Sequence, residues 1–265
     1  MLFRSISLAV IGFALAAIVG VLPFGMNVQK ENREETIINQ DQSIFVNAIR
    51  NGEKGLDDLT NYVYAITNWV TEFGPGKPKP LYTLGYTYLT SSRDGTTMSP
   101  PFPITNGFRI VGLLSTPKLV FFDAGKVSGF RSNHVVAYVR ALSGNASEKF
   151  PQNNPSVQDL AFTYRMISEV FPYNEFERNW TNFNDQSIAG NTNEITTRSN
   201  FWMLTKTMQA NLYDLRLIFR YPFLPNGKTG DGRLVFRTGA SGSLQATNEA
   251  GFPTDLPYQI GRAHV

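Results

Sequence analysis

The chain has 265 residues, of which 42% are hydrophobic, 13% aromatic and 17% charged. This composition supports a packed core and excludes a wholly disordered chain. Cysteine is absent, which excludes disulfides, thiolate catalysis and cysteine metal ligands. The length fits one medium-sized domain with extensions or two small domains. The 22 glycines and 15 prolines favour a turn-rich β-sheet protein over a helical bundle.

Both ends of the chain look foreign to the protein. Residues 1–5 (MLFRS) and 260–265 (IGRAHV) resemble translations of a common short-read sequencing adapter, so we expect a protein truncated at both ends. Without Arg4 and Arg262, the 24 basic residues become 22 against 21 acidic ones, and the net charge falls from +3 to +1. A balance this close to neutral gives no reason to expect a nucleic-acid partner.

Residues 6–26 carry no charge and predict a membrane-spanning helix. As a helix they would extend about 32 Å, close to the thickness of the hydrocarbon core of a bilayer. Their many alanines and glycines are typical of helices that pack against other helices in a membrane. The side chains assigned to membrane and assembly contacts are Leu8, Val10, Ile11, Phe13, Leu15, Ile18, Val19, Leu22, Pro23, Phe24 and Met26.

A cleaved signal peptide is the simplest alternative for this segment. A signal peptide is normally followed by a small-residue cleavage site and a non-helical linker. Here Ile37, Ile38, Phe45 and Ile49 recur at helical spacing among polar residues, so we predict one helix over 6–51. Pro23 either kinks or loosens this helix, or marks the end of the helix or its exit at the membrane interface.

A second helix is predicted over 55–73. Its apolar residues follow helical spacing, Asp57 and Asp58 suit the start of a helix, and the sequence GPGKPKP at 74–80 would end it. The apolar residues that carry this pattern are Leu56, Leu59, Tyr62, Val63, Ile66, Trp69, Val70 and Phe73.

The remainder of the chain is rich in β-branched and aromatic runs bounded by turn residues. Residues 226–232 predict a hairpin turn between the last two strands, and 179–202 predict a polar loop. The expected fold is α+β, with a long N-terminal helix followed by an amphipathic helix packed on an antiparallel sheet. The predicted strands are 81–90, 108–114, 118–122, 134–142, 160–171, 212–221 and 233–238.

Candidate sites in this β-rich part are few. His134 has no evident Ser or acidic partner, so a structural role is favoured over catalysis. The loop 226–232 has one acidic residue, too few for a calcium cage. Asn145 and Asn179 match glycosylation sequons by pattern only. We therefore predict no enzyme, no cofactor and no metal. Five aromatic residues are candidates for glycan contacts, with core packing as the default expectation: Tyr82, Tyr86, Tyr88, Phe176 and Trp180.

The segment ISLAVIGFALAAIVGVLPFGMNVQKE resembles the N-terminal segment of type IV pilin-like proteins, specifically type II secretion pseudopilins. GVLPFG, FVNAIRNG, GLDDLTNYV and DLRLIFRYPFLPNG are similar to phrases in large pseudopilin-like proteins of Verrucomicrobia-type bacteria. The resemblance implies a basic leader cut by a prepilin peptidase and a glutamate just after the cut, both missing here. It also implies a proline late in the apolar helix, as at Pro23.

The domain division that follows is a membrane and assembly helix over 6–54 and a head over 55–259. The resemblance implies a filament subunit held in the bacterial inner membrane, with its head in the periplasm or exterior. Its implied partners are lipid, other pilin-like subunits and inner-membrane assembly proteins. Two alternatives stay open, namely a tethered β-domain that binds polysaccharide and an anchored hydrolase.

Overall fold

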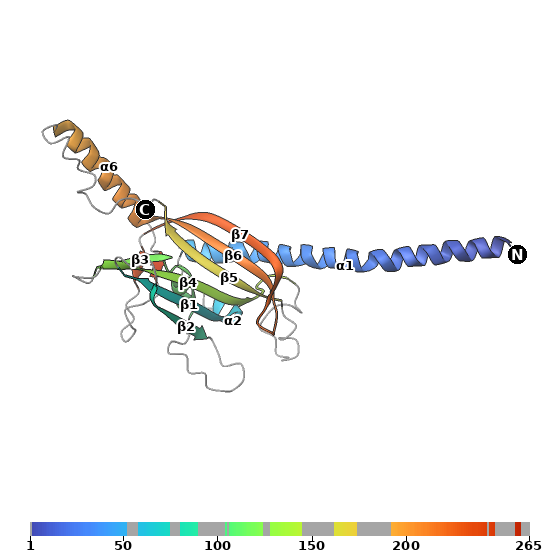
Figure 1. Cartoon of the computed structure of the whole chain (residues 1–265). Helices are drawn as coiled ribbons and strands as arrows, with labels where there is room; N and C mark the ends of the chain where they lie inside the picture. Colours follow the sequence, from blue (N-terminus) through green and yellow to red (C-terminus); the bar gives the residue numbers. More distant parts are fainter. Residues whose placement is uncertain are drawn as a thin grey trace.

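The computed structural model describes residues 2–51, 58–74, 80–89, 104, 106–123, 128–144, 162–173, 192–242, 244–246 and 258–260. Helix α1 (Leu2–Asn51) leaves the head as a straight rod, with the N-terminus at its far end (Figure 1). The fold is α+β, as predicted. The other helices are α2 (Leu59–Tyr62), α3 (Gly107–Leu114) and α6 (Thr192–Asn211).

The head is built on a seven-stranded antiparallel sheet. Six strands lie in the order β2-β1-β4-β5-β6-β7, and β3 pairs with the first part of β4, beside β5. A separate two-stranded sheet joins β8 (Leu244–Ala246) to β9 (Tyr258–Ile260). The strands of the large sheet are β1 (Val63–Phe73), β2 (Pro80–Leu89), β3 (Leu119–Asp123), β4 (Ser128–Arg140), β5 (Thr163–Pro172), β6 (Leu212–Phe223) and β7 (Thr229–Ser241).

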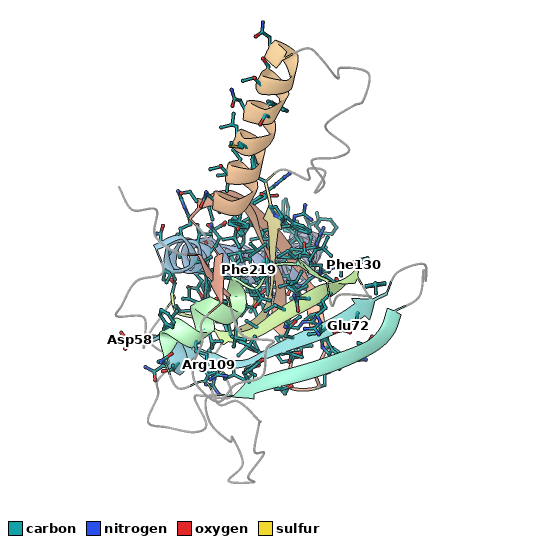
Figure 2. All side chains as sticks on the ribbon, turned by 90° about the vertical axis from the view of Figure 1, so that its left-hand side faces the viewer. Asp58, Glu72, Arg109, Phe130 and Phe219 are labelled. Atoms are coloured by element: carbon teal, nitrogen blue, oxygen red, sulfur yellow. The ribbon has the colours of Figure 1, made fainter. Side chains whose placement is uncertain are left out.

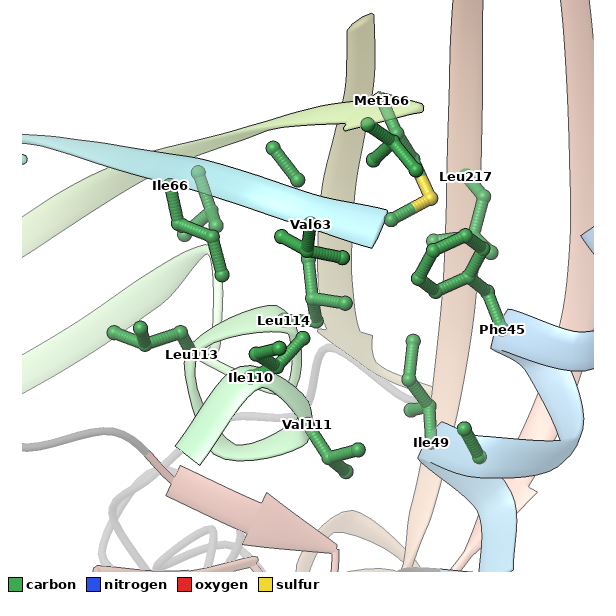
Figure 3. Packing of buried hydrophobic residues seen from close by; sticks show 14 of the residues in the cluster. Phe45, Ile49, Val63, Ile66, Ile110, Val111, Leu113, Leu114, Met166 and Leu217 are labelled. Carbon is green, nitrogen blue, oxygen red and sulfur yellow. The ribbon is translucent and has the colours of Figure 1, made fainter. Parts of the chain in front are cut away.

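Helices cover one face of this sheet, and on the other, which we call the open face, the described residues of β6 and β7 are half-buried or exposed. The second half of α1 and the short helix α3 pack on the covered face, where Phe45 and Ile49 meet side chains from the strands (Figure 3). Met166 of β5 and Leu217 of β6 belong to the same buried cluster as Leu113 of α3. Because side chains alternate along a strand, every second residue points to the open face instead.

The predicted helix over 55–73 is wrong. Within its described part, only Leu59–Tyr62 is helical, and β1 follows at once, ending at Phe73. The covered face of β1 contains the polar residues Asn68 and Glu72. They interrupt the alternation of apolar and polar residues that would have predicted a strand. Both polar side chains have partners from β4, since Asn68 donates to Asn133 and Glu72 pairs with Arg131. Glu72 lies with Phe130 at the end of the sheet opposite Asp58 (Figure 2).

The predicted strand over 108–114 is also wrong, because these residues form α3. Asn106 caps this helix, and its side-chain oxygen accepts a hydrogen bond of 2.9 Å from the Arg109 backbone N–H. Nearly all of α3 is buried between α1 and the sheet, so an eight-residue helix shows no polar face. A short apolar run of this kind cannot be told from a buried strand by periodicity.

The polar segment predicted over 179–202 is helical where it is described, since α6 begins at Thr192. This helix runs directly into β6 and projects from the head on the side away from the N-terminal rod (Figures 1 and 2). The remaining predicted strands are present. The predicted hairpin at 226–232 is confirmed: Leu224 and Lys228 close it by a backbone hydrogen bond, and Gly227 adopts a φ of 80°.

Candidate functional site

Helix α1 has two halves with opposite surroundings. Ten of the eleven predicted membrane and assembly residues are 57–79% exposed, and Pro23 is exposed as well. In the second half, Ile38, Phe45 and Ile49 are fully buried against the head. The head therefore covers α1 only after its apolar half has ended.

The helix is continuous through Pro23 and ends at Asn51, so the alternative that Pro23 marks the helix end is wrong. Proline lacks the N–H that would bond to the fourth preceding carbonyl, which leaves one backbone bond missing at this point. At its apolar half, α1 is long and apolar enough to cross a membrane, and none of that stretch is buried. The helix is therefore compatible with a single membrane span. A signal sequence near an N-terminus meets the same criteria of length and composition.

Small residues line one side of the apolar half. Gly12, Ala16 and Gly20 are four residues apart, which places them along one face of the helix. A Cβ atom built at Gly12 or Gly20 would have no atom within 4 Å apart from its own helical turn. Such a face allows another helix to approach the backbone closely, and the head does not occupy it.

Asp41 joins the docked half of α1 to the head, and the sequence interpretation missed it. It is buried in the middle of the apolar stripe that contacts the sheet. Its carboxylate accepts hydrogen bonds from the backbone N–H groups of Leu142 (2.9 Å) and Ser143 (2.8 Å) and from the Tyr164 hydroxyl (2.9 Å). A lone acidic residue among Ile37, Phe45 and other apolar positions was the available signal.

Burial raises the pKa of Asp41, although its hydrogen bonds with Ser143, Leu142 and Tyr164 act in the opposite direction. Burial, followed by the nearby Asp41 charge, likewise raises the pKa of the Tyr164 hydroxyl, which therefore stays protonated and able to donate. The charge of Asp41 is thus tolerated because it accepts hydrogen bonds from three donors, one on β5 and two in the segment that follows β4.

The open face of the sheet carries His134. Its ring makes no hydrogen bond among the described residues, and it lies opposite Trp69 in the register of β1 and β4. Burial, then Lys118, lowers the pKa of His134, while Glu169 raises it. Glu169 is itself paired with Lys118 and Arg216, so the arrangement shows no acid–histidine pair of the catalytic kind.

The other predicted site residues are spread over the chain. Tyr88 is buried and belongs to the core, as the default expectation for these aromatic residues has it, so it is not available for glycan contacts. The side chains of Tyr82 and Tyr86, and all of Asn145, Phe176, Asn179 and Trp180, lie outside the described residues. Trp69, which was not a candidate, is half exposed and lies across Gly85 of β2. This packing covers a strand glycine, a known way to stabilise a sheet edge.

No protein-family model matches the chain, and neither a curated protein nor a solved structure matches it. Among the described residues, no group of three or more His, Cys, Asp or Glu side chains is arranged to hold a metal ion. The candidate site is the uncovered apolar half of α1. Asp41 helps to hold the docked half of the same helix against the head.

Proposed function

We propose that this chain is a pseudopilin-like structural subunit of a type II secretion or type IV pilus-like filament. Its N-terminal helix would be inserted in the inner membrane and would later pack against the helices of neighbouring subunits. The observation that carries the proposal is the single unbroken α1, exposed and apolar in one half and docked on the sheet in the other.

A helix of this kind needs an apolar environment. Transfer from lipid to a filament is favourable only where neighbouring helices replace the lost lipid contacts. The face containing Gly12, Ala16 and Gly20 supplies a surface for such close contacts. The role is mechanical, so none of the residues assigned to it is catalytic.

The first test is the genomic sequence upstream of the codon for Ile6. The proposal expects a short basic leader ending in glycine and a glutamate immediately before Ile6. An upstream sequence with neither feature would contradict the pilin-like proposal and favour a tethered domain.

The second test is cross-linking in bacterial membranes. The chain has no native cysteine, so introduced thiols report without background. Ala14→Cys combined with Ala16→Cys places thiols about 200° apart around α1. Oxidation should give a ladder longer than a dimer, because each subunit would contact neighbours on two sides.

Gly20→Leu in the same double-cysteine background is the matched control. This change disturbs no contact within the subunit, since nothing lies within 4 Å of a side chain built there. It should shorten the ladder by blocking close helix approach. A protein that stays monomeric in the membrane with or without Gly20→Leu would instead support the tethered β-domain.

A further inference from the structure

Three arginines stand side by side on the open face of the sheet. Arg165 of β5 is directly opposite Arg220 of β6, which is directly opposite Arg233 of β7. Their chain neighbours Tyr164 and Phe219 are fully buried on the covered face, so the three arginines point the other way. Neighbouring strands are about 4.8 Å apart, so this arginine row extends across about 10 Å.

Other charges on the same face are compensated. Four residues further along, Glu169 lies 3.2 Å from the Lys118 ammonium and 3.4 Å from Arg216. Arg237 of β7 donates from Nε to both oxygens of Asp214, at 2.7 and 2.9 Å. Oppositely charged side chains that are neighbours on this face therefore form ion pairs.

The arginine row has no such compensation from the part of the chain that the structure describes. Within the described residues, none of its three members makes an ion pair or a side-chain hydrogen bond. The Arg165 Nε is buried and has no acceptor. Asp231, the nearest acid along β7, is exposed and forms no ion pair with Arg233. Like charges directly opposite one another and a buried N–H without an acceptor both destabilise the sheet.

An anionic ligand would offset the repulsion between the like charges, because a guanidinium can bind a carboxylate or sulfate through two parallel hydrogen bonds. We propose that the arginine row binds an acidic polysaccharide, whose anionic groups on successive sugars pair with arginines on successive strands. The chain of sugars would run across the strands.

An apolar row beside the arginines favours a sugar over a nucleic acid. Val136, Ile167, Ile218 and Val235 are paired across four strands next to the arginine row. Val136 is buried, Ile167 and Ile218 are half-buried, and Val235 is 43% exposed, so the accessible part of this row lies on β5, β6 and β7. Such a surface suits the apolar faces of sugar rings. Bases would need a free aromatic ring, whereas Tyr138, at the end of the arginine row, already packs against Tyr64 and Phe223 at 6.1 and 5.2 Å.

The inference is independent of filament formation, because the arginine row lies on one subunit. The test uses the full chain in non-ionic detergent and measures equilibrium binding to alginate, a polyuronate. Neutral dextran of matched length, a single-stranded DNA oligonucleotide and vesicles containing anionic lipid serve as competing probes. Alginate should bind more tightly than all three, and its affinity should fall as salt is raised.

Arg233→Gln and Arg237→Gln are matched variants, since both remove one exposed arginine from the same face of β7. Arg233→Gln should weaken alginate binding about fivefold and the triple change of the arginine row by more than about tenfold, while Arg237→Gln should change it less than about twofold. Thermal unfolding of each variant shows that it folds, and replacing the like charges should not lower the midpoint.

The proposal is overturned by any of three results. Equal binding of dextran and alginate would remove the role of charge. Tighter binding of the oligonucleotide or of the vesicles would assign the arginine row to another class of anion. Equal damage from Arg237→Gln and Arg233→Gln would show a diffuse charge effect with no site at the row.

Discussion

The two halves of α1 use the same secondary structure for opposite purposes. In the first half, residues such as Leu8 and Phe24 present their apolar side chains outward all round the helix. In the second half, Ile38, Phe45 and Ile49 belong to one buried stripe, and most of the remaining surface is polar. A helix that is apolar all round needs an apolar partner outside the subunit, whereas a helix with one apolar stripe is completed by its own sheet. The boundary between the halves thus separates the part of α1 that folds against the sheet from the part to which we assign the proposed membrane insertion and assembly.

Truncation of the docked half should have the largest effect on the head. Phe45→Ala removes a fully buried ring from the core and should lower the unfolding free energy by about 3–5 kcal/mol. Ile44→Ala, at the neighbouring exposed position, should change it by less than about 0.5 kcal/mol. Urea unfolding in non-ionic detergent measures both. Equal losses would mean that α1 does not dock as described.

A charge in the free half should block insertion without unfolding the head. Leu15→Asp places a carboxylate near the middle of the apolar half and should disfavour insertion by about 2.5–3.5 kcal/mol. Fractionation should then show the variant lost from the membrane, with an unchanged unfolding midpoint in detergent. Asn39→Asp, on the exposed side of the docked half, should keep the protein in the membrane.

Changes at Asp41 test how the docked half of α1 is held to the head. Asp41→Asn replaces one accepting oxygen by a donor that faces another donor, so it should cost about 1–3 kcal/mol of unfolding free energy. Tyr164→Phe removes only one of the three hydrogen bonds and should cost less, about 0.5–1.5 kcal/mol. The reverse order of these two effects would contradict the role assigned to Asp41.

The pH dependence of stability gives the smallest and most specific effect. Because the pKa of Asp41 is raised, the folded protein holds this proton to a higher pH than the unfolded chain does. The Asp41 contribution to unfolding free energy is therefore greatest in acid. It declines as pH rises above about the ordinary value of 3.8 through the folded pKa, and then levels off. Subtracting the pH profile of Asp41→Asn from that of the wild-type chain should isolate this decline. A difference that grows with pH would contradict a raised pKa.

The spacing of apolar residues predicted α1 and most of the strands, because in these elements the contacts made in the fold agree with the pattern in the sequence. It failed at β1, where Asn68 and Glu72 are buried only because β4 supplies Asn133 and Arg131 as partners. It failed again at α3, whose burial on several sides leaves no polar face to reveal a helix. In both places, contacts distant in sequence decide the structure.

The candidate site divides in the same way. The apolar half of α1 is evident from composition alone, since its character is continuous along the chain. Asp41 and the arginine row depend on register, which brings together residues more than fifty positions apart, such as Arg165 and Arg220. No spacing rule within one segment predicts such neighbours.

The absence of any break between the two halves has a rotational consequence. Each residue turns a helix by about 100° and advances it by about 1.5 Å, so the number of residues between Asp41 and Gly20 fixes the angular phase between the head and the small-residue face. One alanine inserted near Val28 would swing the head by about 100° about the helix axis, whereas four would bring it back to within about 40°. The number of residues between Gly20 and Asp41 thus determines the orientation of the head relative to the small-residue face.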